Sequence, residues 1–234
     1  MDCRLDARDP MPELPLPEHD ATSIVLIGAF NPRIFHPAWF VRNHLLPVGD
    51  EVASNIEIVN NDVCAFETDW FRLEVLGDRF ILRSMATPAV EALRDLVLGT
   101  FRVLRHTPIQ RIGLNTHAHF ALPEESGWHR FGHMLAPKPD LWEPILKNPG
   151  TLSLTIEGQR PDDYAGHVRA KVEPSARIEW GIFFESNDEY QKLEADSADW
   201  LEDVLLTRWD SSRSHAMEMR QHVLGHAYDL EDRG

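Results

Sequence analysis

The order of its expected segments is the feature that most constrains the fold of this chain. The order runs strand, short helix, several strands and long helix, and it then recurs in the second half. Residues 22–30 (TSIVLIGAF) form an apolar, β-branched run that fits a buried central strand. Residues 111–120 begin the second half with a comparable strand. The recurrence predicts an α+β fold of two pseudo-duplicated strand–helix–strands–helix halves that share an antiparallel sheet.

Proline, glycine and apolar spacing place the remaining elements. Pro37 suits the first turn of a helix, where its missing N–H costs little, and Gly77-Asp78 indicates a hairpin turn. The first half is expected to contain a helix over 36–46, strands over 55–59, 63–68, 71–76 and 79–85, and a helix over 87–104. The second half is expected to contain a helix over 123–134, a helical turn over 141–146, strands over 151–157, 166–173 and 177–185, and a helical region over 196–230 that breaks near 210–212.

Length and the N-terminal composition set the domain organisation. We expect a flexible, acidic, proline-rich tail over 1–20, a first half over 21–106 and a second half over 107–234. A chain of 234 residues can bury roughly 70% of its unfolded surface, so the two halves should form one compact domain. No apolar run approaches the roughly 20 residues that a membrane-spanning helix needs. The start MDCRLDARDP lacks the features of a signal peptide, and the expected location is the cytoplasm.

Alternation along the strands separates two faces of the sheet. We expect the long helices to cover the apolar face and to leave the polar face open. The covered face of residues 111–120 carries Ile112, Leu114, Ala118 and Phe120. The expected core and inward positions also include Leu93, Phe101, Leu152, Leu154, Ile156, Ile178, Trp180, Ile182 and Phe184. The candidate binding residues on the open face are Arg111, Asn115, His117, His119, Arg169 and Lys171.

A net charge of −15 disfavours general affinity for nucleic acid and anionic membranes, because like charges repel. The acidic residues crowd near the start of the last helical region. This acidic patch comprises Glu185, Asp188, Glu189, Asp196 and Asp199. It is interpreted either as a solvated helix N-terminus, where carboxylates complement the helix dipole, or as a docking patch for a basic protein surface.

Histidines suggest chemistry, but none belongs to a complete motif. His117 and His119 point to the same side of a strand, yet Ala121 and Leu122 stand where a metallo-β-lactamase signature requires Asp and His. His129 and His133 have a spacing that can seat zinc, without a third ligand or an adjacent Glu. Serine-nucleophile, phosphate-loop and dinucleotide motifs do not occur either. We therefore predict no metal site, no cofactor and no catalytic residue, and we lean toward a protein that is not an enzyme.

Two resemblances bear on function. The duplicated order resembles the fold of the TATA-box-binding protein, whose sheet lies on nucleic acid; this likeness concerns topology alone. The segments RIGLNTHAHF (111–120) and EESGWHRFGHMLAP (124–137) resemble a sporadically distributed family of uncharacterised bacterial proteins, over about half of the chain. That family supplies no catalytic residue to transfer, and its distribution implies a defence- or mobile-element-associated role.

The leading functional hypothesis is a non-catalytic interaction or regulatory protein. It would bind a protein partner, or a second copy of itself, through the open sheet face or the acidic patch. The first alternative is a histidine-dependent metal-binding protein or hydrolase built around His117 and His119, with His129 or His133 as a further member. The second alternative is nucleic-acid binding through the sheet.

Overall fold

The computed structural model describes residues 16–50, 54–85 and 90–229, and it confirms an α+β fold with an antiparallel sheet. The strands are β1 (His19–Gly28), β2 (Asn55–Val59), β3 (Val63–Glu67), β4 (Phe71–Leu76), β5 (Arg79–Ser84), β6 (Ile109–Ala121), β7 (Leu154–Gln159), β8 (Gly166–Pro174) and β9 (Gly181–Gln191). The helices are the 3-10 turn η1 (Pro32–Ile34), α1 (Pro37–Arg42), α3 (Val90–Val103), α4 (Glu125–Leu135), α5 (Trp200–Thr207) and α6 (Trp209–Asp229).

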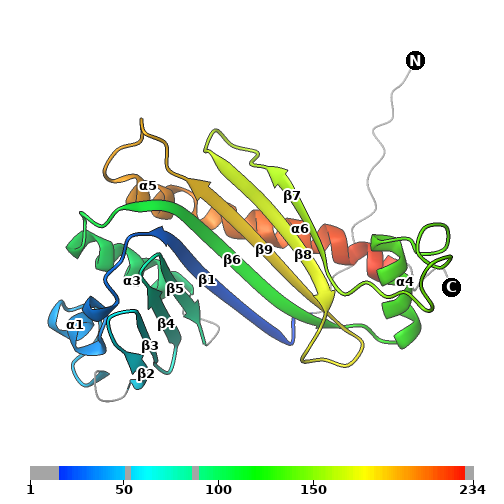
Figure 1. The fold of residues 1–234 in the computed structure, drawn as a ribbon, viewed down its shortest axis with the longest axis horizontal. Helices are drawn as coiled ribbons and strands as arrows, with labels where there is room; N and C mark the ends of the chain where they lie inside the picture. Colours follow the sequence, from blue (N-terminus) through cyan, green and yellow to red (C-terminus); the bar gives the residue numbers. More distant parts are fainter. Residues whose placement is uncertain (1–15, 51–53, 86–89, 230–234) are drawn as a thin grey trace, which may run out of the picture.

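The nine strands form one sheet in the order β2-β3-β4-β5-β1-β6-β9-β8-β7. The first strand of each half therefore lies at the centre, where β1 and β6 pair antiparallel with Ser23 opposite Asn115. The later strands of each half step outward to the two edges in reverse chain order. In Figure 1 the long strands β1, β6, β9 and β8 cross the view, and α5 and α6 lie behind them.

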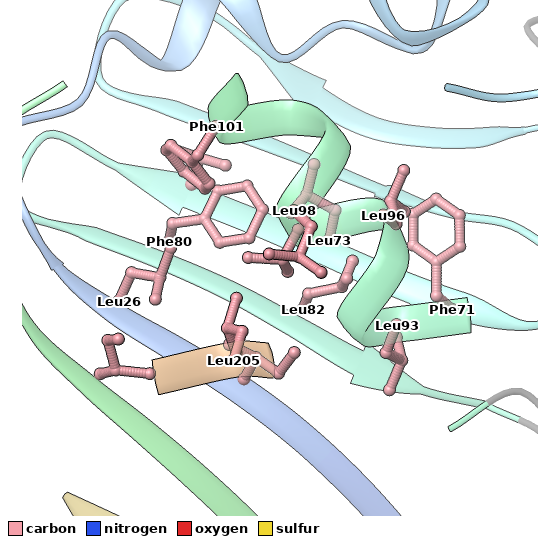
Figure 2. Close-up of a cluster of buried hydrophobic side chains, with 14 of the residues drawn as sticks. Leu26, Phe71, Leu73, Phe80, Leu82, Leu93, Leu96, Leu98, Phe101 and Leu205 are labelled. Carbon is pink, nitrogen blue, oxygen red and sulfur yellow. The ribbon is translucent and has the colours of Figure 1, made fainter. Parts of the chain in front are cut away.

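The larger hydrophobic core lies between the sheet and helices α3 and α5. Leu93, Val97 and Phe101 are four residues apart on α3, so they share one helical face, and all three are buried. Figure 2 shows this face of α3 meeting side chains from β1, β4 and β5, with Leu205 arriving from α5. A second cluster joins β6 and β9 to α4 and α6 through Phe120, Phe131, Phe184 and Leu224, among others.

Strand alternation identified the covered face correctly on the central strands. Ile112, Leu114, Ala118 and Phe120 of β6 are all buried, with exposures of 0–4%. Leu93, Phe101 and Phe184 are buried as expected, although Phe184 belongs to the second cluster and not to the cluster of the other two.

The expectation for Trp180 and for the edge strand β7 was wrong. Strand β9 begins at Gly181, so Trp180 lies in the preceding turn with φ +53° and is 37% exposed, while Ile178 in that turn is half-buried. Leu152 and Ile156 are 84% and 60% exposed, and Leu154 is half-buried. The physical reason is position: β7 is the last strand of the sheet, whereas α6 packs over the more central β6 and β9.

Several element boundaries also differ from expectation. The predicted tail over 1–20 lies outside the described residues up to residue 15, and His19 and Asp20 already belong to β1. The expected start of the long helix at residue 87 likewise lies outside them. The last helical region breaks between Thr207 and Trp209, slightly before the predicted 210–212. Over the described ranges, no helix has the length and apolar character needed to cross a membrane.

Candidate binding cavity on the open sheet face

The structure places all six candidate binding residues on the open face of the sheet. Asn115, His117 and His119 alternate with the buried residues of β6, and Arg111 begins the same row. The register between neighbouring strands extends this open face from β6 across β9 to β8. Asn115 lies opposite Asn187, which lies opposite Arg169 of β8. His117 lies opposite Glu185, which lies opposite Lys171.

Carboxylates on the same face pair with three of these residues. Arg111 Nη1 lies 3.8 Å from Glu189 Oε1, and Arg169 binds both Glu157 and Glu189. Lys171 Nζ lies 2.7 Å from Glu173 Oε1. Each basic residue on β8 and at the start of β6 is therefore balanced by a carboxylate on the same face. Together they do not form a positively charged patch.

The acidic patch does not exist as one surface, because Glu185, Asp188 and Glu189 belong to β9 and not to a helix start. The sequence predicts that this strand ends at residue 185, whereas β9 pairs with β6 as far as Gln191. Glu185 and Glu189 face the open side. Asp188 faces the other way and is 4% exposed, where it binds Arg160 and accepts a hydrogen bond from the Tyr190 hydroxyl at 3.2 Å.

The two remaining members of the predicted patch lie at the entry to α5. Asp196 Oδ2 accepts a 2.7 Å hydrogen bond from the Leu193 N–H, and it therefore holds the turn that follows β9. Asp199 is the exposed N-cap residue of α5. Their position supports the interpretation of these two carboxylates as a solvated helix N-terminus.

A cavity of about 800 Å³ opens at one end of the same face, and we call it the histidine cavity. Its wall combines the start of β1, the ends of β3 and β5, the start of β4, the C-terminal part of β6, and the start of β9 with the turn that leads into it. The residues that line it include His19, Arg72, Arg83, His117, His119, Arg177, Phe183 and Glu185. Sequence reasoning had named only His117 and His119 as binding residues in this wall, and Glu185 as part of the acidic patch.

His117 is a largely enclosed imidazole in the wall. Its ring stacks on Phe183 with centroids 6.3 Å apart, and its Nε2 atom is buried without a hydrogen-bond partner among the described residues. Burial, followed by the charges of Arg83, His119 and Arg177, lowers the pKa of His117 to about 4. The imidazole is therefore neutral at physiological pH and presents an unsatisfied polar atom.

His119 and His19 extend this aromatic wall. The His119 ring lies 4.9 Å from Phe183 and 6.1 Å from His19, both measured between centroids. Its Nδ1 atom lies 2.8 Å from Ser175 Oγ. Burial and the charges of Arg177 and His19 lower the pKa of His119. These contacts hold the imidazole plane in place beside the cavity.

Two arginines of the histidine cavity are exposed to solvent. Arg83 and Arg177 are exposed, and within the described part of the chain neither has a carboxylate within 4.0 Å. Both are nevertheless close enough to depress the pKa of His117. Four carboxylates share this wall: Glu67, which lies 3.9 Å from Arg72, together with Glu18, Asp20 and Glu185.

The histidines that the sequence singled out for metal binding lie in two separate places. Over residues 16–50, 54–85 and 90–229, no group of three His, Cys, Asp or Glu side chains is placed to hold a metal ion. His129 and His133 lie on α4 and line a different cavity from His117 and His119. His129 instead has Glu125 as its neighbour, with Nε2 and Oε1 3.6 Å apart.

Arg83 and Arg177 could not be predicted as site residues from the sequence, because their positions depend on the strand order and on a turn. Arg83 alternates with buried residues on β5, and this alternation alone assigns it to the open face. Its position near His117 depends on the strand order, which places β5 next to β1 and β1 next to β6. Arg177 lies in a turn, where alternation carries no information. Neither protein-family models nor curated protein sequences give a match to this chain, so the site is interpreted from its geometry.

Proposed function

We propose that this protein is a non-catalytic interaction protein that binds a polar segment of a partner protein in the histidine cavity. The observation that carries the proposal is the pair of exposed guanidinium groups, Arg83 and Arg177, that lack ion pairs in the described structure and flank a neutral imidazole. An acidic residue of the partner would bind these guanidinium groups, because arginine recognises carboxylates through two parallel N–H donors. A neighbouring polar group could then hydrogen-bond Nε2 of His117.

The charge balance of the rest of the face favours a protein segment over nucleic acid. Glu157, Glu173 and Glu189 stand among the basic residues of the open face, and a long polyanion would have to approach them. A short segment avoids this repulsion, because it engages one end of the sheet alone. The presence of Glu185 in the same wall suits a segment that carries both an acidic and a basic or hydroxyl group.

The hydrolase alternative rests on the contact between His119 and Ser175, and the surroundings of this contact favour a structural role. Ser175 Oγ accepts hydrogen bonds from the backbone N–H groups of Arg177 and Ile178 at 3.1 and 3.0 Å. With both lone pairs engaged, the hydroxyl donates its proton to Nδ1 of His119. An activated nucleophile needs a free lone pair and a base that is itself oriented.

We further infer that residues 21–106 and 107–234 are pseudo-duplicate halves. The support is the strand order. Strands β1 and β6 are neighbours at the centre, and the next strand outward from each is the last strand of the same half, β5 beside β1 and β9 beside β6. This arrangement gives each half a central strand and an outward meander. On the resemblance described above, we place the proposed interaction in a defence- or mobile-element-associated assembly.

The test is titration of the full chain with acidic, basic and nucleic-acid probes. We expect hexaglutamate to bind more tightly than hexalysine or a short oligothymidylate. The double variant Arg83→Gln, Arg177→Gln should weaken hexaglutamate binding at least about tenfold, since hydrogen bonds to charged groups contribute about 1.5–3 kcal/mol. The matched control is Arg42→Gln, Arg79→Gln, which removes two exposed cations outside the cavity.

The outcomes separate the three functional hypotheses. Equal loss of affinity in both double variants would show that net charge, and not the cavity, governs binding. Preference for oligothymidylate would replace the proposal with nucleic-acid binding. Stoichiometric zinc retained through mild chelation, and lost in a His117→Ala, His119→Ala variant, would replace it with metal binding.

A further inference from the structure

A second cavity lies on the helix-covered side of the sheet, between α4, the segment 138–151 and the adjoining ends of β8 and β9. Its volume is about 580 Å³, which is within the range of small-molecule sites. Most of its wall is apolar. The apolar side chains in the wall are Trp128, Phe131, Leu135, Pro149, Val172, Pro174 and Ile182.

Lys138 introduces a positive charge into this apolar wall. The residue is 4% exposed, and its Nζ donates hydrogen bonds to two neutral oxygens, the Gly132 carbonyl and the Thr151 hydroxyl. No carboxylate of the described residues lies within 4.0 Å of Nζ. Burial alone lowers the pKa of this ammonium group. Buried charges are ordinarily paired, so an unpaired lysine in a cavity wall is a feature that needs an explanation.

The hydrogen-bond inventory of Lys138 leaves room for a ligand. An ammonium group has three N–H donors, and the protein uses two of them. The third is available to a group that enters the cavity. Two carboxylates also line the space, but Glu173 is paired with Lys171 at 2.7 Å and Glu143 is exposed. His129 and His133 of α4 complete the titratable groups in the wall.

We propose that this cavity binds a small apolar molecule with a single carboxylate, such as a medium-chain fatty acid. The carboxylate would accept the third N–H of Lys138 and neutralise its charge. The hydrocarbon part would lie against Trp128, Phe131 and Ile182, where burial of apolar surface stabilises the complex. This site is separate from the histidine cavity, which lies on the opposite face of the sheet.

The head group provides the test, because neutral and cationic ligands with the same hydrocarbon chain are available. Octanoate, octanol and octylammonium are titrated into the full chain by calorimetry. We expect octanoate to bind at least about tenfold more tightly than octanol, as for a hydrogen bond to a charged group, and octylammonium to bind most weakly. Equal affinities of the wild-type protein for octanoate and octanol would overturn the proposal.

A variant then assigns the preference to Lys138. Lys138→Met keeps the length of the side chain and removes its charge, so octanoate binding should weaken about tenfold or more while octanol binding persists. Lys147→Met, an exposed lysine of the same segment, should leave both affinities unchanged. A preference for octanoate that survives in Lys138→Met contradicts the assignment. If circular dichroism shows that Lys138→Met does not fold, the comparison of head groups on the wild-type protein decides.

The two proposed sites can fail independently. The Arg83→Gln, Arg177→Gln variant should bind octanoate with wild-type affinity, because both arginines line the other cavity. The Lys138→Met variant should in turn keep its affinity for hexaglutamate. Loss of octanoate binding in the arginine variant would place the carboxylate in the histidine cavity and overturn the assignment to Lys138.

Discussion

Asp188 and Arg160 form an ion pair whose side chains are only 6% and 4% exposed. The guanidinium also binds Asp162 at 2.8 Å, and it lies 3.6 Å from the centroid of the Tyr190 ring. Tyr190 in turn donates its hydroxyl proton to Asp188. The four side chains tie β9 to the loop between β7 and β8, so this network is structural and not a partner-binding acidic patch.

Asp188→Ala should destabilise the protein by about 3–5 kcal/mol, because it leaves the buried Arg160 without its principal counter-charge. Glu185→Ala, on the same strand but on the open face, should change the free energy of unfolding by no more than about 0.5 kcal/mol. Urea denaturation of both variants measures the difference. Similar small losses in the two variants would show that Asp162 alone neutralises Arg160.

His117 should make the protein less stable as the pH falls from 6.5 to 4. Its pKa is about 4 in the folded protein and 6.5 when exposed, so between these values the unfolded chain binds more protons. Relative to a His117→Phe variant, the wild-type protein should lose up to about 3 kcal/mol across this window. Denaturant titrations at a series of pH values provide the measurement. Parallel pH profiles for the two proteins would mean that the imidazole is not enclosed.

The sequence predicted the fold class because its central strands have clear patterns. On β4, burial on one face alone imposes strict alternation. On β6 the apolar residues Ile112, Leu114, Ala118 and Phe120 mark the covered face, although Gly113 and Asn115 on the other face are buried as well. The segment at the edge strand β7 has the same pattern, with Leu152 just before the strand and Leu154 and Ile156 within it, yet Leu152 and Ile156 are exposed. Alternation shows which residues share a face. It does not show whether a helix reaches far enough to cover that face.

The end of β9 was missed for a related reason. Glu185, Asn187 and Glu189 face the open side, and the intervening Ser186 and Asp188 are polar although they are buried. A run of polar residues resembles a solvated helix start when only sequence is available. The partner that permits burial of Asp188 is Arg160, 28 residues earlier, and such a long-range pair leaves no local signal. The position of Arg83 in the histidine cavity likewise depends on the strand order, which the local sequence does not indicate.

Trp180 and Phe184 should respond differently to truncation. Phe184 is 1% exposed in the second hydrophobic cluster, so Phe184→Ala should cost about 3–5 kcal/mol. Trp180 is 37% exposed and packs edge-on against Trp128 at 5.9 Å, so Trp180→Ala should cost about 1 kcal/mol. Urea denaturation of the two variants provides the comparison. Equal costs would place Trp180 in the core, as the sequence alone suggested.

Ser175 should behave as a turn-forming residue and not as a nucleophile. Its Oγ accepts the N–H groups of Arg177 and Ile178 and lies 2.8 Å from Nδ1 of His119, so its lone pairs are occupied. A fluorophosphonate probe should therefore leave the wild-type protein unlabelled. Ser175→Ala should lower the free energy of unfolding by about 1 kcal/mol, the value of a typical hydrogen bond, and Ser175→Thr should restore most of it.

The labelling experiment and the stability experiment together distinguish the two roles of the His119–Ser175 contact. A structural serine predicts a loss of stability without labelling. Stoichiometric labelling of the wild-type protein that disappears in both Ser175→Ala and His119→Ala would establish an activated hydroxyl, because a nucleophile depends on its base. In that case the histidine cavity would be an active site, and its exposed Arg83 and Arg177 would be positioned to bind the anionic end of its substrate.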